Sequence, residues 1–330
     1  MSSGTRELSY SLAINEALHQ SMEGDGRVLL IGQGVKSPWY VGNTTKGLLE
    51  RYGPRRVIDT PVSENAVTGA AVGAALTGMR PVVVHPRMDF MLYCFDPIIN
   101  QAANWHYMSG GAAAVPVVFW GIVNRGGEQA AQHSQALHSM FCHVPGLKVV
   151  APSCPVDAKG LMLAAIHDEN PVVFMDERWL YNTTEPVPRE PYRTPIGKGI
   201  VRRHGSDVTL VCYSGMVAPA LQAASRAQER GISCLVLDLR TLKPLDADLL
   251  MKSVRRTGRA IVCDIGWKTG GWGAEIVATI VEAGVPLKSP PRRVALPDAP
   301  AGAARTLEAG YYPTADDLLD SIISVCRGEG

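Results

Sequence analysis

Short apolar runs of two kinds alternate along most of the chain, and this alternation limits the available folds more than any other feature. Runs such as RVLLIG at 27–32 and RPVVVHP at 80–86 have the length and the branched residues of buried strands. Between such runs lie longer segments with helical periodicity, for example YSLAINEALHQSM at 10–22 and PVDAKGLMLAAIHD at 155–168. Strands that alternate with helices predict parallel sheets covered by helices on both faces, which is the α/β class.

A proline-rich stretch interrupts the alternation. RWLYNTTEPVPREPYRTPIG at 178–197 contains four prolines and little periodicity, and the alternation resumes after it. We therefore expect one α/β domain over residues 1–185, a linker over 186–196 and a second α/β domain over 197–330. The 330 residues of the chain are enough for two domains of roughly 150 residues each.

The composition excludes several classes of protein. The chain has 32 lysines and arginines against 31 acidic residues, so no excess of charge predicts binding to nucleic acid or to a membrane surface. Its apolar stretches are shorter than the ~20 residues of a membrane span, and its first residues lack the pattern of a signal peptide. Seven cysteines without a CxxC pair are expected to be free thiols. We expect a soluble, cytoplasmic protein.

One tripeptide, GDG at 24–26, could begin the thiamine diphosphate signature, in which an asparagine follows some distance later. That site needs GDG at the end of a strand and the start of a helix, where backbone and metal meet the diphosphate. Here GDG follows a helical segment and precedes a strand, and Asn43 comes too early. We interpret GDG as a turn. Because no other phosphate or metal motif is present, the chain is not expected to hold a diphosphate by itself.

A single acidic residue, Glu64, stands at the head of a run of small apolar residues. After it, no charged residue appears until Arg80. One interpretation is an acid stabilised by the helix dipole at a helix N-terminus. The other is a functional carboxylate at the mouth of a buried segment, and the spacing alone leaves both open.

Long stretches of the chain resemble one family, in order and over nearly the whole length. They are DTPVSENAVTGAAVGAALTGMRPVV at 59–83, DFMLYCFDPIINQAANWHYMSGG at 89–111, QHSQALHSMFCHVPGLKVVAPSCPVDAKG at 132–160, TGGWGAEI at 269–276 and PDAPAGAARTLEAGYYPTADDLLDSI at 297–322. These stretches resemble the transketolase-like family, and most of all the beta subunit of the two-chain 2-oxo acid dehydrogenases. The resemblance implies a pyrimidine-binding α/β domain followed by a transketolase C-terminal α/β domain.

The resemblance also implies roles for single residues. Glu64 matches the glutamate that hydrogen-bonds N1′ of the aminopyrimidine of thiamine diphosphate and so shifts the tautomer of that ring. Phe90 matches the aromatic residue that packs on the same ring, and Met88 is expected to contact the cofactor beside it. His133 matches the active-site histidine, which orients the substrate and moves protons. Two nearby histidines, at 138 and 143, do not match and are interpreted as structural.

Two stretches depart from the family pattern. Where the family has QFADY, this chain has PRMDF at 86–90, and the loop before the histidine is NRGGEQAAQ at 124–132. Arg87 and Arg125 in these stretches could bind a carboxylate or phosphate of the substrate through bidentate hydrogen bonds. Exposure of both arginines to solvent is the alternative.

The segment AAIHDENP at 164–171 resembles the loop that binds a structural potassium ion in the family. The carbonyls of Ala165, Ile166 and Asn170, and a group of Asp168, would be its ligands. Oxygen ligands alone suit a hard cation, and a plain turn before a strand is the alternative.

The resemblance implies that an alpha subunit holds the diphosphate and Mg²⁺, so that thiamine diphosphate lies across the interface of an α2β2 heterotetramer. The leading function is decarboxylation of a small-molecule 2-oxo acid, with transfer of the acyl group to a lipoyl transacylase. A two-chain carboligase or transketolase that moves a two-carbon unit to an aldehyde or ketone is the first alternative. A non-catalytic assembly subunit is the second, and the presence of Glu64, Phe90 and His133 together argues against it.

Overall fold

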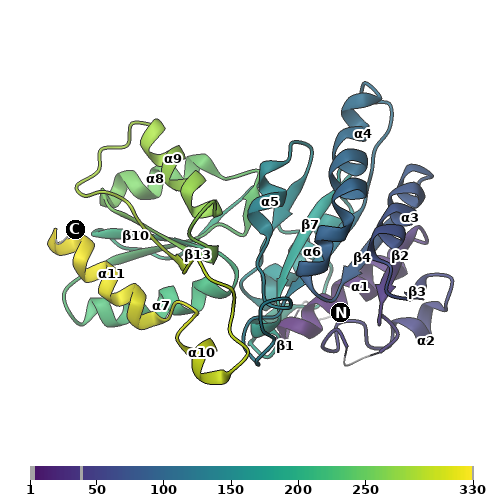
Figure 1. The fold of residues 1–330 in the computed structure, drawn as a ribbon, viewed down its shortest axis with the longest axis horizontal. Helices are drawn as coiled ribbons and strands as arrows, with labels where there is room; N and C mark the ends of the chain where they lie inside the picture. The colour runs from purple at the N-terminus through teal and green to yellow at the C-terminus, as the bar shows by residue number, and fades with distance from the viewer. Residues whose placement is uncertain (1–3, 38–39, 329–330) are drawn as a thin grey trace.

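Each half of the chain is built around one β-sheet (Figure 1). The computed structural model describes residues 4–37 and 40–328. The first sheet has seven strands in the order β12-β6-β7-β5-β4-β2-β3, and the second has five in the order β14-β13-β10-β11-β9. Both consist mainly of parallel pairs, so the predicted α/β class is confirmed.

The strands are short and mostly buried on both faces. The first sheet contains β2 (Val28–Gln33), β3 (Val57–Thr60), β4 (Arg80–His85), β5 (Val118–Val123), β6 (Lys148–Val150), β7 (Val172–Glu177) and β12 (Thr241–Lys243). The second contains β9 (Ile200–Arg203), β10 (Val208–Cys212), β11 (Cys234–Asp238), β13 (Ala260–Trp267) and β14 (Arg292–Leu296). Strand β12 follows the second domain's β11 in sequence but pairs antiparallel with β6, so the first sheet is completed by the second half of the chain.

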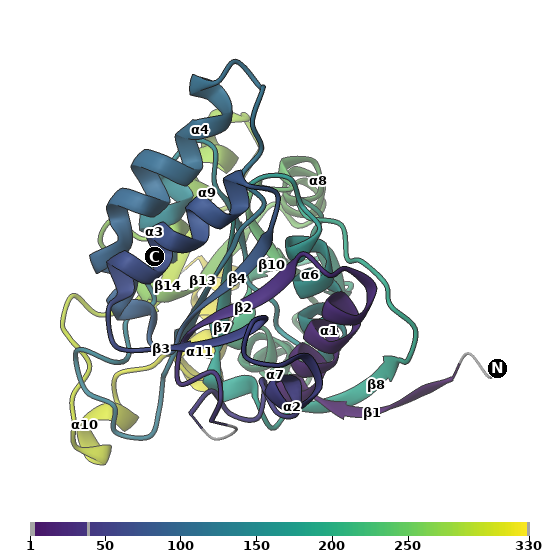
Figure 2. The ribbon, with the colours of Figure 1, turned by 90° about the vertical axis from the view of Figure 1, so that its right-hand side faces the viewer.

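Helices cover both faces of each sheet (Figure 2). On one face of the first sheet lie α1 (Tyr10–Gly24) and α6 (Pro155–Ile166), and on the other lie α3 (Glu64–Leu76), the π-helical η2 (Asp96–Ala102) and α4 (Ala103–Met108). The second sheet is flanked by α7 (Val217–Gln228) with α11 (Ala315–Arg327), and by α8 (Ala247–Thr257) with α9 (Trp272–Glu282). Shorter elements are α2 (Leu48–Tyr52), α5 (His138–His143), α10 (Arg305–Ala309), η1 (Met88–Cys94), η3 (Arg178–Leu180) and η4 (Ser214–Met216).

Part of the proline-rich stretch between the domains forms a strand. Strand β8 (Thr184–Pro188) pairs antiparallel with β1 (Thr5–Ser9) in a separate two-stranded sheet, with Pro186 opposite Glu7. Proline is tolerated there because an edge strand needs no amide donor on its open side. The first residues of the expected linker are therefore held by the N-terminal strand.

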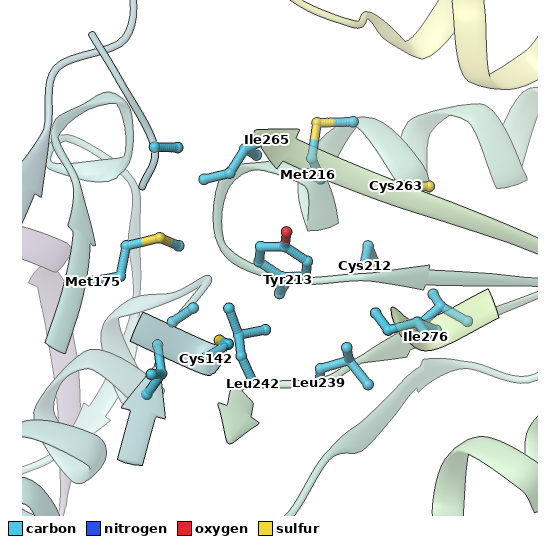
Figure 3. Close-up of a cluster of buried hydrophobic side chains, with 14 of the residues drawn as sticks. Cys142, Met175, Cys212, Tyr213, Met216, Leu239, Leu242, Cys263, Ile265 and Ile276 are labelled. Atoms are coloured by element: carbon cyan, nitrogen blue, oxygen red, sulfur yellow. The ribbon is translucent and has the colours of Figure 1, made fainter. Parts of the chain in front are cut away.

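The apolar core on the α3 face of the first sheet is continuous with the core of the second domain. Figure 3 shows Met175 and Cys142 of the first domain near Tyr213 and Leu242, which follow in the second half of the chain. The α1 and α6 face forms a core of its own. Because fully burying one large apolar side chain contributes about 1.5–3 kcal/mol, the shared core holds the two domains in one arrangement.

A buried polar cluster also joins the domains. The Tyr213 hydroxyl donates to Oδ1 of Asp264 on β13, and it lies 2.7 Å from Nε2 of His138 in the first domain. His138 is fully buried, in agreement with the structural role expected for it. Burial by itself raises the pKa of Asp264, but the hydrogen bond and charge of His138 and the Tyr213 hydroxyl outweigh burial and lower it to about 2.

The GDG tripeptide forms a turn, as predicted. Gly24 ends α1, and β2 begins at Val28. Oδ1 of Asp25 accepts from the backbone N–H of Arg27 at 2.8 Å, and the Arg27 side chain lowers the pKa of Asp25 to about 2. The carboxylate is therefore already engaged within its own turn.

Two further properties concern the whole described chain. No helix within residues 4–37 and 40–328 combines the length and the apolar character that crossing a membrane requires. The seven cysteines are all free of disulfide bonds, and most are buried.

Asp264→Asn should destabilise the protein at neutral pH and progressively less in acid. The folded-state pKa of Asp264 is about 2, below the ~3.9 of an unfolded aspartate. The stabilisation by its carboxylate is therefore complete above about pH 4 and is lost as the pH falls further. We expect a loss on the order of 2 kcal/mol in unfolding free energy at neutral pH, with the gap to wild type narrowing below about pH 4 in urea titrations.

Asp320→Asn is the matched control, because Asp320 lies exposed on α11. Its unfolding curves should follow those of the wild type at every pH. A gap for Asp264→Asn that stays constant in acid would contradict an ionised, hydrogen-bonded Asp264.

Candidate active site

A crevice opens between the carboxyl ends of β2 and β4. The chain leaves β2 towards β3 and leaves β4 towards β5, in opposite directions along the sheet. Such a switch point is where open α/β sheets bind ligands. The crevice is lined by residues that end β2, β3 and β4 or begin α3, namely Gly32, Gln33, Thr60, Pro61, Ser63, Glu64, Val67, Val84, His85 and Pro86.

The two strands pair in parallel up to the crevice, where Gly32 lies opposite Val84. The φ of +154° at Gly32 is unusual for other residues, and a Cβ at this position would lie 2.5 Å from the carbonyl oxygen of Val84 on β4. No other residue fits this backbone approach without a shift of the strands. Gly32 therefore allows β2 and β4 to stay paired at the edge of the crevice.

Glu64 is the first residue of α3, and its half-buried side chain lines the crevice. Within the described part of the chain, its carboxylate has neither a hydrogen bond nor an ion pair. An acidic side chain is favourable at this position, beside the positive end of the helix dipole. Glu64 is thus an acid at a helix N-terminus that also lines the crevice, and its functional role stays a prediction.

Phe90 and His133 lie against each other. The Phe90 ring, on η1, meets the His133 ring edge to face, with the centroids 5.4 Å apart and the planes at 85°. Both side chains are half-buried. The structure thus brings together two residues that are separated in the sequence by η2, α4, β5 and the loop after β5.

Two hydrogen bonds that the sequence did not predict connect the segments that carry these rings. The backbone N–H and the side-chain amide of Gln135 donate to Oδ1 of Asp89, at 3.2 and 2.8 Å. Burial raises the pKa of Asp89, and the hydrogen bond from Gln135 offsets part of this rise. Asp89 precedes Phe90, and Gln135 belongs to the HSQ tripeptide of His133. Membership of these two motifs is the signal in the sequence that could have indicated the contact.

Met88 points into the core. Its side chain is fully buried and contacts Gly121 on β5, where an added Cβ would lie 3.2 Å from Met88 Cγ and 2.5 Å from Met91 Sδ. This position does not support the contact with the cofactor that was expected of Met88, which stays only a prediction.

Arg87 follows the end of β4 and is half-buried. Its guanidinium donates to the carbonyl of Pro86 at 2.8 Å and to Oε1 of Gln129 at 3.2 Å, while its buried Nε has no partner among the described residues. The described chain places no carboxylate within ion-pair distance of it. A guanidinium in this state is suited to receive an anion.

Arg125 is placed differently. Its Nε lies 3.1 Å from Oε1 of Glu177 at the end of β7, and both side chains are buried. Its guanidinium carbon lies 5.7 Å from the ring centroid of Trp179 and 5.1 Å from that of Tyr312 in the second domain. These contacts tie the loop that carries His133 to both domains.

The two arginines lie at different places. Arg87 follows Pro86, which lines the Glu64 crevice. Arg125 lines a hollow between the domains that shares no residue with that crevice. Its partner Glu177 also accepts from the backbone N–H of Gly215 in the second domain, at 2.8 Å. Because a buried carboxylate already compensates the charge of Arg125, Arg87 is the better placed of the two for a substrate anion.

The loop between β5 and α5 is held in a costly conformation. Glu128 and Ala130 have φ of 62° and 60°, in the left-handed region that residues other than glycine rarely adopt. The N–H of Glu128 donates to Oε2 of Glu308 at 2.9 Å, and the side chain of Asn124 donates to the carbonyl of Pro86 at 3.1 Å. Backbone strain of this kind persists where surrounding contacts enforce it, often beside functional groups.

The turn after α6 already receives a cationic side chain. Nη1 of Arg80 donates to the carbonyls of Ile166 and Asp168, at 3.2 and 3.1 Å. Oδ1 of Asp168 accepts from the backbone and side-chain N–H groups of Asn170. Because the carboxyl end of a helix attracts cations, this turn suits a positive charge, and a potassium ion bound by it and Ala165 stays a prediction.

Arg125→Met should lower the free energy of unfolding by about 3 kcal/mol, because it leaves the carboxylate of Glu177 buried without its partner. Combining it with Glu177→Gln should recover a large part of that loss in urea titrations. Arg305→Ala is the control, since that side chain is 85% exposed and surface ion pairs contribute ~1 kcal/mol or less. Equal losses of unfolding free energy for the two arginine variants would contradict a stabilising ion pair between Arg125 and Glu177.

Comparison with known proteins agrees with this architecture. Residues 6–184 match the transketolase pyrimidine-binding domain, and residues 197–318 match the transketolase C-terminal domain. The beta subunit of the pyruvate dehydrogenase E1 component from Rickettsia felis is 42% identical over 315 residues, which cover 95% of this chain and 97% of that protein. The beta subunit of acetoin:2,6-dichlorophenolindophenol oxidoreductase from Cupriavidus necator is 42% identical over 334 residues, which cover 98% of each chain.

A solved structure has the same fold. The chain of a split gene transketolase, described as an inactive beta4 tetramer, superimposes with a TM-score of 0.80 at 21% identity, covering 98% of this chain and 99% of that one. Domain matches, whole-length relatives and fold agree with one another. The chain belongs to the transketolase-like family, and within it to the beta subunits related to those of the thiamine diphosphate-dependent 2-oxo acid dehydrogenases.

Proposed function

We propose that this chain is the beta subunit of a two-chain enzyme that uses thiamine diphosphate to decarboxylate a 2-oxo acid and passes the acyl group to a lipoyl transacylase. One observation carries the proposal: Glu64 offers an unpaired carboxylate at the switch point of the first sheet. Phe90 and His133 lie in ring contact near the end of the adjacent strand. The full-length relatives named pyruvate dehydrogenase E1 beta support it.

The residues present fit the pyrimidine end of that cofactor. The crevice combines the carboxylate of Glu64 with a wall that Gly32 keeps free of a side chain. When bound, thiamine diphosphate supplies a carbon acid whose anion attacks carbonyl groups. Glu64 would exchange a proton with a ring nitrogen of the heterocycle, because its carboxylate lines the crevice and has no partner in the described chain.

Phe90 and His133 would have separate roles in the same site. Phe90 offers a partly buried face for stacking against the heterocycle. His133 would orient the substrate carbonyl and move a proton at its oxygen. The edge contact with Phe90 and the anchor from Gln135 to Asp89 limit the positions that the imidazole can take.

An alpha subunit would hold the diphosphate and Mg²⁺, giving an α2β2 heterotetramer. The GDG tripeptide supports this division of labour, because the Asp25 carboxylate is bound by Arg27 within a helix-to-strand turn. The proposal also includes potassium at the turn of Ala165, Ile166, Asp168 and Asn170.

The substrate is the least constrained part of the proposal. Relatives of equal identity are named for pyruvate and for acetoin. The two substrates differ in one group that a protein can recognise by charge, since only a 2-oxo acid has a carboxylate. Arg87, which has no carboxylate partner in the described chain, favours the 2-oxo acid. Arg125, which is paired with Glu177 and lines another hollow, would add only a weaker electrostatic attraction to that carboxylate. A carboligase or transketolase reaction is the alternative, and product analysis with and without an aldehyde acceptor separates it.

Glu64→Gln, assembled with the alpha subunit, should reduce turnover about 100-fold or more. An amide cannot exchange the proton that the heterocycle must gain and lose. Hydrogen–deuterium exchange at C2 of the bound cofactor, followed by NMR after acid quench, is the direct measurement. Glu50→Gln on the exposed side of α2 is the control. Exchange at the wild-type rate in Glu64→Gln would refute the role of Glu64.

Arg87→Ala should raise KM for pyruvate about tenfold or more, because it removes a charged hydrogen bond. It should leave KM for acetoin within about twofold, since acetoin offers no anion. Steady-state assays of CO₂ release and of acetoin consumption measure the two. A parallel rise for both substrates would mean that Arg87 shapes the site without binding a carboxylate.

A further inference from the structure

His85 lies in the same crevice as Glu64, and the function proposed above gives it no role. It is the last residue of β4, its side chain is 2% exposed, and it lines the crevice. Burial lowers the pKa of His85 to about 4. The ring is therefore neutral near pH 7, with one nitrogen that donates and one that accepts.

Hydrogen bonds inside the chain determine which nitrogen carries the proton. Nε2 of His85 lies 3.4 Å from Oγ1 of Thr68, which follows Glu64 by one turn of α3. The Thr68 hydroxyl donates its single hydrogen to Sγ of Cys94 at 3.3 Å. Its oxygen can then only accept from His85, so Nε2 carries the hydrogen and Nδ1 carries the lone pair.

Nδ1 has no partner among the described residues, although it is shielded from solvent. A buried acceptor without a donor is costly, and folded proteins rarely keep one. With this tautomer, Nδ1 of His85 is an unpaired acceptor. His85 lines the same crevice as Glu64, whose carboxylate is also unpaired.

We propose that His85 is a second ligand-binding residue of the crevice and that its Nδ1 accepts a hydrogen bond from an N–H donor on the nitrogen heterocycle held by Glu64. The inference rests on the proposed function, which supplies that heterocycle. The crevice then offers a charged and a neutral group to one ring, which fixes the orientation of the ring as well as its position. Thr68 and Cys94 act as positioning residues, because they set the tautomer of His85.

Binding of thiamine diphosphate with Mg²⁺ to the complex of both subunits, measured by isothermal titration calorimetry, tests this without turnover. His85→Phe removes the acceptor and keeps a ring, and it should weaken binding about tenfold. His85→Gln retains an acceptor oxygen and should bind within about threefold of wild type. His106→Phe, on the exposed side of α4, should change nothing. Unchanged affinity in His85→Phe overturns the proposal, and so does an equal loss in both His85 variants when their cofactor-free complexes melt like wild type.

Thr68→Val tests the tautomer separately, because it removes the hydroxyl with little change in shape. It should weaken binding severalfold, and ¹⁵N NMR of labelled histidine should show that Nε2 no longer carries the hydrogen exclusively. Retention of one tautomer at full affinity overturns the role of Thr68 and with it the argument for Nδ1. A wild-type complex that binds no thiamine diphosphate overturns the proposed function itself, whereas tight binding that is indifferent to His85 overturns only the present inference.

Discussion

The close approach of β2 and β4 at their carboxyl ends is the constraint on which the site depends. Gly32 permits it, because any Cβ there would lie 2.5 Å from the carbonyl oxygen of Val84. The chain then leaves these neighbouring strands in opposite directions, and a crevice opens between them. The first turn of α3 and the last residue of β4 face the same small space for this reason. Glu64 and His85 are neighbours through topology and not through sequence.

The other half of the site depends on the second domain. His133 lies on a loop without regular structure, and contacts from both domains hold that loop. Arg125 is paired with Glu177 and packed on Tyr312, and Glu128 donates to Glu308. The core behind α3 continues into the second domain. Separating the domains would therefore expose apolar surface, at a free-energy cost of about 25 cal/mol per Å². The position of His133 is thus a property of both domains.

Local patterns predict much of the fold and little of what joins its parts. The segments expected as α6 and β4 begin and end within about two residues of the observed bounds, because periodicity is set by neighbours in sequence. Strand β12 escapes prediction, since three residues from the second half of the chain pair with β6. The family motifs identify Glu64 and His133. The hydrogen bonds from Gln135 to Asp89 and the ion pair of Arg125 arise only from tertiary packing. No alternation or spacing in the sequence encodes them.

Four of the buried polar atoms without partners lie at the same edge of the first sheet. Among the described residues they include Oγ1 of Thr60, Nδ1 of His85, Nε of Arg87 and Oδ2 of Asp89, all at or just beyond the carboxyl ends of β3 and β4. Each such atom costs about 1–3 kcal/mol in the isolated chain, and a chain under selection for stability alone would replace them with apolar atoms. A ligand or partner that supplied the missing donors and acceptors would recover this cost. A ligand without matching groups would leave these atoms unpaired, so the same atoms that weaken the isolated chain would disfavour that ligand.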